Sequence, residues 1–141
     1  MTGPFWTAMN ARPRIPMDEL RATDLPHPDP GVYALYRDGH PVYVGLAEKQ
    51  SLRGRFWGNH RGRGTSMTGS ALRRNVAEHL GIATAADIKS RRYRPDTEDA
   101  ARVVRSIDGC EVAWISCVTP EGARRLEADL KAEHKPPLTK R

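Results

Sequence analysis

With 141 residues, the chain has the length of one domain that can bury a sizeable core. It has no apolar run near the ~20 residues that a membrane-spanning helix needs, and its first residues lack the pattern of a signal peptide, which argues against a membrane or secreted protein. The net charge is +6, and it is spread unevenly along the chain.

The positive charge is concentrated in residues 50–94. This segment holds ten basic and two acidic residues and carries +8, whereas the remainder of the chain carries −2. A block of one sign attracts a polyanion, so nucleic acid is the favoured partner; a basic face that is merely solvated is the alternative. The basic residues that we expect to contact phosphates are Arg53, Arg61, Arg63, Arg73, Arg74, Arg91, Arg92 and Arg94.

Residues 1–30 contain six of the eleven prolines and show no sustained periodicity. They predict an irregular leader, followed by a domain over residues 31–141. That domain opens with a β-hairpin over residues 31–46, in which the pair Asp38-Gly39 is a strong turn signal.

Register decides where the two tyrosines of this hairpin lie. A loop with an odd number of residues pairs Tyr33 with Gly45 and Leu35 with Tyr43, and it places both phenols on one face at a diagonal separation of ~7–8 Å. An even loop would place them on opposite faces. We expect the odd loop, and we expect Gly45 to leave room for a ligand beside the backbone.

The remaining elements are predicted from apolar periodicity and from capping residues. They are helices over residues 51–60, 70–80, 97–107 and 119–134 and a strand over residues 110–118. Cys110 and Cys117 would lie roughly 23 Å apart along that strand, beyond the reach of a disulfide, which favours a reducing cytoplasm.

Glu127 is the residue that most strongly suggests chemistry. On the last helix, Ala123, Leu130 and His134 lie within about 20° of one another. Glu127 falls about 40° away, inside the apolar stripe, where a carboxylate is costly unless a cation or hydrogen-bond donors meet it. It either pairs with an arginine such as Arg55 or holds a hard cation such as Mg²⁺, which prefers oxygen ligands and needs only one or two protein carboxylates.

A metal ion at Glu127 would suit phosphodiester hydrolysis. Water bound to a divalent ion is easier to deprotonate, and the ion neutralises charge on the phosphate. An arginine can grip phosphate oxygens. A tyrosine with the ordinary pKa of about 10 is a poor base at neutral pH, but a nearby metal and arginine make its phenolate accessible.

Five segments follow one another in a distinctive order. They are Gly31-Val32-Tyr33, Tyr43-Val44-Gly45, Leu52-Arg53-Gly54-Arg55, Glu127 and Lys135-Pro136-Pro137-Leu138-Thr139. This set resembles the GIY-YIG nuclease family over roughly residues 31–139. The resemblance implies a small α/β (α+β) domain with a three-stranded antiparallel sheet flanked by helices. It also implies an endonuclease that depends on Mg²⁺ or Mn²⁺ and cleaves nucleic acid, usually DNA.

The resemblance also implies roles for individual residues. Tyr33 would be the general base or the group that positions water, and Tyr43 would position the phosphate or the nucleophile. Arg55 would stabilise charge on the phosphoryl group, and Glu127 would ligate the metal. His60 resembles a histidine that some members place after the arginine, although a surface histidine beside a basic loop is the alternative.

Thr139 departs from the family, which often ends in Pro-Pro-Leu-Asn. A threonine hydroxyl offers one donor on a short stem, whereas an asparagine amide offers two donors and an acceptor. This difference leaves a second function open, that of a module that binds nucleic acid without cleaving it. A basic protein that associates with RNA is a third.

Overall fold

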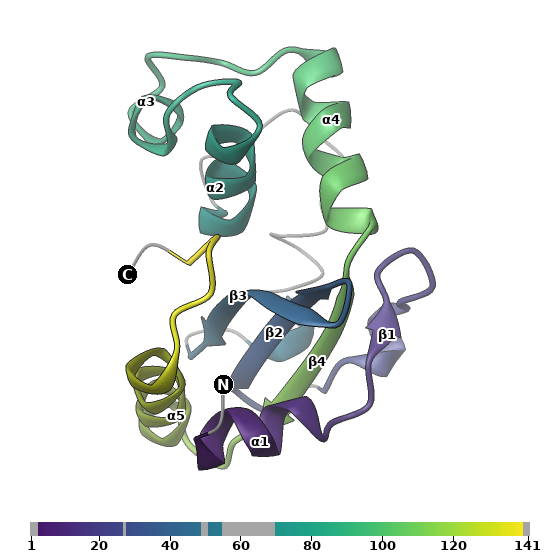
Figure 1. Cartoon of the computed structure of the whole chain (residues 1–141), viewed down its shortest axis with the longest axis vertical. Helices are drawn as coiled ribbons and strands as arrows, with labels where there is room; N and C mark the ends of the chain where they lie inside the picture. Colours follow the sequence, from purple (N-terminus) through teal and green to yellow (C-terminus); the bar gives the residue numbers. More distant parts are fainter. Residues whose placement is uncertain (1–2, 27, 49–50, 55–69, 140–141) are drawn as a thin grey trace.

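The computed structural model describes residues 3–26, 28–48, 51–54 and 70–139, and these form an antiparallel sheet with helices on both faces (Figure 1). The strands are β1 (Ile15–Pro16), β2 (Gly31–Arg37), β3 (His40–Ala47) and β4 (Glu111–Ser116). Their order is β1-β4-β2-β3. The α+β prediction is confirmed, but the sheet has four strands rather than three because β1 pairs with β4.

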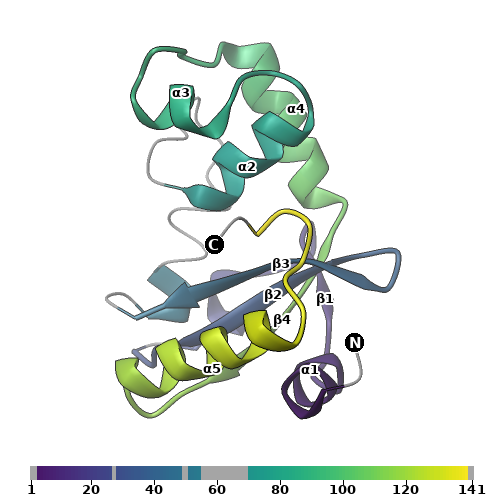
Figure 2. The ribbon, with the colours of Figure 1, turned by 60° about the vertical axis from the view of Figure 1, so that its left-hand side comes forward.

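Two groups of helices cover the sheet. The helices are α1 (Pro4–Asn10), α2 (Ala71–His79), α3 (Ala85–Lys89), α4 (Thr97–Asp108) and α5 (Pro120–Glu133), with a 3₁₀ turn at Ala22–Asp24. In Figures 1 and 2, α2, α3 and α4 form one layer, and α1 and α5 lie on the opposite side of the sheet. The predicted helices over residues 70–80, 97–107 and 119–134 are therefore confirmed, whereas most of residues 51–60 lies outside the described residues.

Local sequence explains where the confirmed helices begin. The hydroxyl of Ser70 accepts a hydrogen bond from the backbone N–H of Arg73, and the carboxylate of Asp96 accepts one from Asp99. Such side-chain caps satisfy backbone donors that have no partner in the first helical turn. Helix α5 begins in the same way at Thr119, with a proline at its first position.

Strand β2 is buried on both faces, because its alternate side chains enter different cores. Tyr33 and Leu35 pack in the core that α2 and α4 cover, together with Leu72 and Val103. The neighbouring residues Val32, Ala34 and Tyr36 pack in a second core, with side chains of α1, β4 and α5. The strand therefore serves as the common wall of the two layers.

Residues near the N-terminus differ from the predicted irregular leader. Helix α1 buries Trp6 and Met9 completely, and the indole Nε1 of Trp6 donates hydrogen bonds to the carbonyls of Leu130 (2.8 Å) and His134 (3.0 Å). The carboxylate of Glu133 accepts bonds from the first backbone N–H groups of α1, including that of Trp6 (2.9 Å). This helix is held by a partner more than a hundred residues away, which local periodicity does not reveal.

The two cysteines are free thiols, as predicted. They flank β4, and burial raises the pKa of both Cys110 and Cys117. Within the described ranges, no helix combines the length and the apolar character needed to cross a membrane.

Candidate active site

Tyr33 and Tyr43 lie on one face of the hairpin. Tyr33 pairs with Gly45 and Leu35 pairs with Tyr43, and the centroids of the two phenol rings are 6.2 Å apart with a 33° angle between their planes. The predicted register and shared face are therefore confirmed.

The odd number of residues between Leu35 and its partner Tyr43 arises from a bulge, which the sequence did not indicate. The turn itself has two residues, Asp38 and Gly39, which adopt the left-handed values φ = 52° and φ = 79° typical of a tight hairpin turn. A bulge then shifts the register after the Leu35–Tyr43 pair, so that Tyr36 pairs with Pro41. The bulge supplies the extra residue that keeps both tyrosines on one face.

Gly45 is a close-approach position, but the group that approaches it is Tyr33. A side-chain carbon at Gly45 would collide with the phenolic end of Tyr33. The prediction that Gly45 leaves room for a ligand is therefore wrong, because the Tyr33 ring occupies that space. Tyr33 itself is 0% exposed, and its ring makes a tilted contact with that of Tyr43.

A cleft of about 440 Å³ opens at the β3 edge of the sheet. Its lining residues come from α2 and α3 on one side and from α5 on the other. Figure 2 shows the C-terminal segment (residues 134–139) running between these helices. Tyr43, Glu127 and Thr139 line it from β3, α5 and the C-terminal segment. Arg74, Lys89 and Lys131 add three cations. The charged side chains that the structure places around this cleft are thus mostly basic, which suits an anionic ligand.

Glu127 lies in the wall of this cleft with its side chain 17% exposed. Its Oε1 atom is 3.3 Å from the Nζ atom of Lys131, one helical turn further along α5. The inward position predicted from the helical stripe agrees with this burial. Arg55, the partner that the sequence suggested, lies outside the described residues, as does His60.

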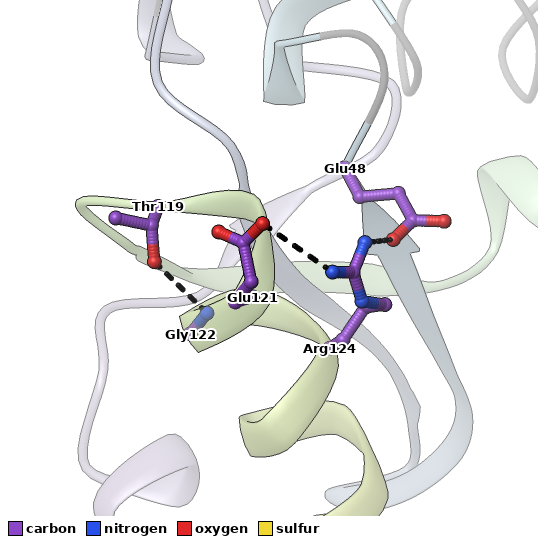
Figure 3. A network of polar contacts seen from close by, with 5 residues as sticks. All are labelled: Glu48, Thr119, Glu121, Gly122 and Arg124. Atoms are coloured by element: carbon purple, nitrogen blue, oxygen red, sulfur yellow. Dashed lines mark hydrogen bonds and ion pairs between the residues drawn. The ribbon is translucent and has the colours of Figure 1, made fainter.

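A polar network fixes the start of α5 relative to the end of β3 (Figure 3). Arg124 contacts Glu48 (Nη1–Oε2, 2.6 Å) and Glu121 (Nη2–Oε1, 3.5 Å), and the hydroxyl of Thr119 accepts a bond from the backbone N–H of Gly122. Glu127 follows Arg124 by less than one helical turn. The Arg124–Glu48 contact therefore helps to hold the Glu127 carboxylate beside β3, the strand that carries Tyr43.

Thr139 closes the free edge of β3. Its hydroxyl accepts a hydrogen bond from the backbone N–H of Val44 (3.0 Å), and the backbone N–H of Leu138 donates to the carbonyl of Val42 (2.8 Å). The side-chain amide of Asn75 in turn donates to the carbonyl of Leu138 (2.9 Å). An acceptor at position 139 is therefore present despite the absence of asparagine.

One predicted phosphate contact must be corrected. Arg73 is 3% exposed, and burial lowers the pKa of its guanidinium. Arg73 lies on the inner side of α2, with Leu72 and Val76, so it cannot meet a nucleic acid at the surface. Its neighbour Arg74 lines the cleft instead.

The other predicted phosphate contacts fall into three groups. Arg91, Arg92 and Arg94 are exposed in the connection from α3 to α4. Arg53 is half-buried, and its Nε atom donates to the carbonyl of Leu25 (3.2 Å). Arg61 and Arg63 lie outside the described residues.

Lys131, Lys89 and Asn75 line the cleft but were not among the residues predicted from sequence. Lys131 follows Glu127 by four residues, and that spacing on a helix was a usable signal for an ion pair. Lys89 lies at the cleft because α3 packs against α2. This packing cannot be predicted from neighbouring residues in the sequence.

The donors of the cleft fit a hard cation. Glu127 offers a carboxylate, and the hydroxyl-bearing residues Tyr43 and Thr139 line the same cleft. Across the described ranges, no group of three or more His, Cys, Asp or Glu side chains could hold a metal. A single carboxylate with retained waters is the arrangement that suits Mg²⁺ rather than Zn²⁺.

A family model described as a GIY-YIG catalytic domain matches residues 26–141. The match includes β2, β3, α5 and the closing segment, and therefore both tyrosines and Glu127. No curated protein and no solved structure matches the chain.

Proposed function

Since this chain belongs to the GIY-YIG family, we propose that it is a divalent-metal-dependent endonuclease that hydrolyses phosphodiester bonds in DNA. A GIY-YIG catalytic domain points to a nuclease and hence to a nucleic-acid substrate. The observation that carries the proposal is the cleft in which Tyr43, Glu127 and three basic side chains meet.

Glu127 would hold Mg²⁺ or Mn²⁺ at the wall of the cleft. The bound ion would supply a more acidic water and neutralise charge on the scissile phosphate. The carboxylate is suited to this because it is largely buried yet lines a cleft, so a bound cation would be shielded from bulk solvent on the protein side.

The two tyrosines would have separate roles toward the attacking water. Tyr43 lines the cleft and would position the phosphate or the attacking water. Tyr33 lies next to it, with ring centroids 6.2 Å apart, but it is 0% exposed. To act as the base or as the group that orients the water, its hydroxyl would have to reach the cleft past Tyr43. As water attacks phosphorus, its proton would pass to the phenolate of the base, the bond to the leaving oxygen would break, and the leaving oxygen would take up a proton from solvent.

Cations would stabilise the charge that develops on the phosphoryl group. Arg55 is proposed for this role, with His60 close by in sequence. A guanidinium is always charged and matches phosphate oxygens with two parallel donors. Arg74 lines the cleft from α2 and provides a second guanidinium for the same anion.

The strand of nucleic acid would continue over the connection from α3 to α4. Lys89 lines the cleft, and the exposed side chains of Arg91, Arg92 and Arg94 follow within five residues. Contacts of this kind bind the phosphate backbone and orient the duplex without reading its sequence. We therefore expect affinity for DNA of any sequence and strong dependence on salt.

Thr139 does not favour the alternative of a binding module without cleavage. Its hydroxyl is engaged with the backbone of Val44 at the strand edge, and in that position it acts as an acceptor. An asparagine carbonyl could perform the same task. The presence of threonine in place of asparagine therefore leaves Tyr43, Glu127 and the basic side chains of the cleft in place.

The test is a plasmid-nicking assay with Mg²⁺ or Mn²⁺ and with a chelator. We expect cleavage that requires the metal, and we expect Glu127→Gln to lower it by about 100-fold or more, the scale on which loss of one transition-state-stabilising group acts. Binding of DNA, followed by gel shift without metal, should persist. Glu19→Gln is the matched control, because Glu19 is exposed three residues after β1, at the opposite edge of the sheet from β3.

Three outcomes would contradict parts of the proposal. If Glu127→Gln cleaved DNA at the wild-type rate, Glu127 would not be the metal ligand. DNA that is shifted but stays intact with either metal would show a binding module, and preferential cleavage of RNA in a competition assay would change the substrate class.

A further inference from the structure

Lys131 is the feature of the cleft that the proposed function leaves unexplained. Its ammonium group lies 3.3 Å from the Glu127 carboxylate, and both side chains are mostly buried, with 23% and 17% of their areas exposed. The Arg124–Glu121 pair on the same helix is much more exposed, at 51% and 74%. The Lys131–Glu127 pair is thus part of the cleft wall rather than an ordinary solvated pair.

This pair places a cation where the proposed metal would bind. A carboxylate oxygen that faces an ammonium group is less available to Mg²⁺, because the two cations compete for the same charge. Arg74 and Lys89 line the same cleft, so a free divalent ion would approach a carboxylate that already has basic neighbours. The electrostatics of the cleft by itself therefore favour a phosphate over a metal ion.

A phosphodiester in the cleft reverses this preference. Its negative charge offsets the basic side chains and gives the Lys131 ammonium a second partner within the same cleft. A lysine side chain has a flexible four-carbon stem, which allows its head group to change partners. Once Lys131 turns to the phosphate, the Glu127 carboxylate is free to accept a divalent cation.

We propose that Lys131 couples metal binding to nucleic-acid binding by exchanging Glu127 for a substrate phosphate. Lys131 is a positioning residue in this scheme, because it acts through Glu127. The free protein binds the metal weakly, and the complex with nucleic acid binds it more tightly. By thermodynamic reciprocity, the metal tightens nucleic-acid binding by the same factor. The inference rests on the proposed function, since it takes Glu127 as the metal ligand.

The experiment is a titration of the full chain with Mn²⁺, followed by calorimetry, alone and with a short DNA duplex. The duplex carries phosphorothioate links, and a gel verifies that it stays intact. For the wild type we expect the duplex to lower the Kd for Mn²⁺ by at least about 5-fold, the lower end of typical coupling between sites. Lys131→Met should bind Mn²⁺ more tightly than the wild type when alone, and the duplex should change its Kd by less than about 2-fold.

Two further variants separate the exchange from a general charge effect. Lys131→Arg keeps the cation and should keep the coupling. Arg125→Met removes one positive charge from an exposed position on the same helix and should behave as the wild type. A loss of coupling in Arg125→Met equal to that in Lys131→Met would overturn the proposal, because the effect would then follow net charge.

Failure of the inference can be told from failure of the proposed function. If Glu127→Gln abolishes Mn²⁺ binding but Lys131→Met leaves the affinity and the coupling unchanged, Lys131 has no coupling role and the metal site stands. If Glu127→Gln binds Mn²⁺ as the wild type does, Glu127 is not the ligand and both proposals fall.

Discussion

The hydroxyl of Thr139 accepts a hydrogen bond from the backbone N–H of Val44 in the edge strand β3. This bond ties the last described residue of the chain to the strand that carries Tyr43. It also gives a partner to a buried donor at the edge of a sheet, where backbone groups otherwise lack one.

We expect Thr139→Val to destabilise the fold, because valine has the shape of threonine but no acceptor. A buried N–H left without a partner costs about 1–3 kcal/mol. The free energy of unfolding in urea measures this loss. Thr139→Ser keeps the hydroxyl and should retain most of the stability. Equal stability of the two variants would show that the bond contributes nothing.

Gly45→Ala should lower both stability and cleavage. The added methyl group would collide with the phenolic end of Tyr33, and overpacking of this kind costs about 1–3 kcal/mol. Because the displaced ring packs on Tyr43, we expect the nicking rate to fall even at temperatures where the variant is folded. Gly81→Ala offers a comparison, since its left-handed φ of 76° makes it strained but nothing lies nearby. It should lose stability without loss of rate per folded molecule.

Arg92→Gln should weaken DNA binding and reduce the dependence of affinity on salt. Arg92 is exposed, and loss of one phosphate contact lowers the slope of log K against log salt by about 1. Fluorescence anisotropy over a range of NaCl concentrations measures this slope. Arg73→Met should leave it unchanged, because Arg73 is buried. A smaller slope in Arg73→Met would contradict its place in the core.

Tyr36 should make the fold sensitive to alkaline pH. Burial raises the pKa of its phenol to about 12, an effect that the charge of Arg14 partly offsets. The unfolded chain has the ordinary pKa of about 10. Below pH 10 both states keep the proton and the contribution of Tyr36 to stability is complete; between pH 10 and pH 12 only the unfolded state readily ionises, so stability falls.

The full loss for this shift is about 3 kcal/mol. It is measured as the difference between wild type and Tyr36→Phe in the free energy of unfolding from pH 8 to pH 12. Phenylalanine lacks the hydroxyl that donates to Asn10 Oδ1 (2.6 Å), so the variant should be less stable at pH 8. Parallel curves for the two proteins would show that Tyr36 titrates normally.

The hairpin and the later helices could be predicted because their signals are local. Asp38-Gly39 specifies the turn, Ser70 and Thr119 specify helix starts, and the glutamate at position 127 stands out from its stripe. The burial of Arg73 was also within reach, since it and Ala77 extend the apolar stripe of α2. The positive charge of this segment favours a surface position for Arg73, whereas its position on the helix favours the core.

Other features depend on partners that are distant in sequence. Helix α1 begins where Glu133 accepts its first N–H groups, and β1 exists as a strand because β4 lies beside it. The bulge after Leu35 and the reach of Lys89 into the cleft are likewise set by tertiary packing. No window of neighbouring residues contains that information.

The alternation of β2 between two cores has a consequence for mutational studies of this protein. Tyr33 and Ala34 are adjacent, yet one supports the tyrosine pair and the other supports the layer of α1 and α5. A substitution that disturbs the packing around Trp6 can therefore displace Tyr33, because a single peptide unit joins the two cores. If a substitution on the face remote from the cleft lowers activity, the cause would then be a displaced backbone. Such a result would not identify the substituted residue as catalytic.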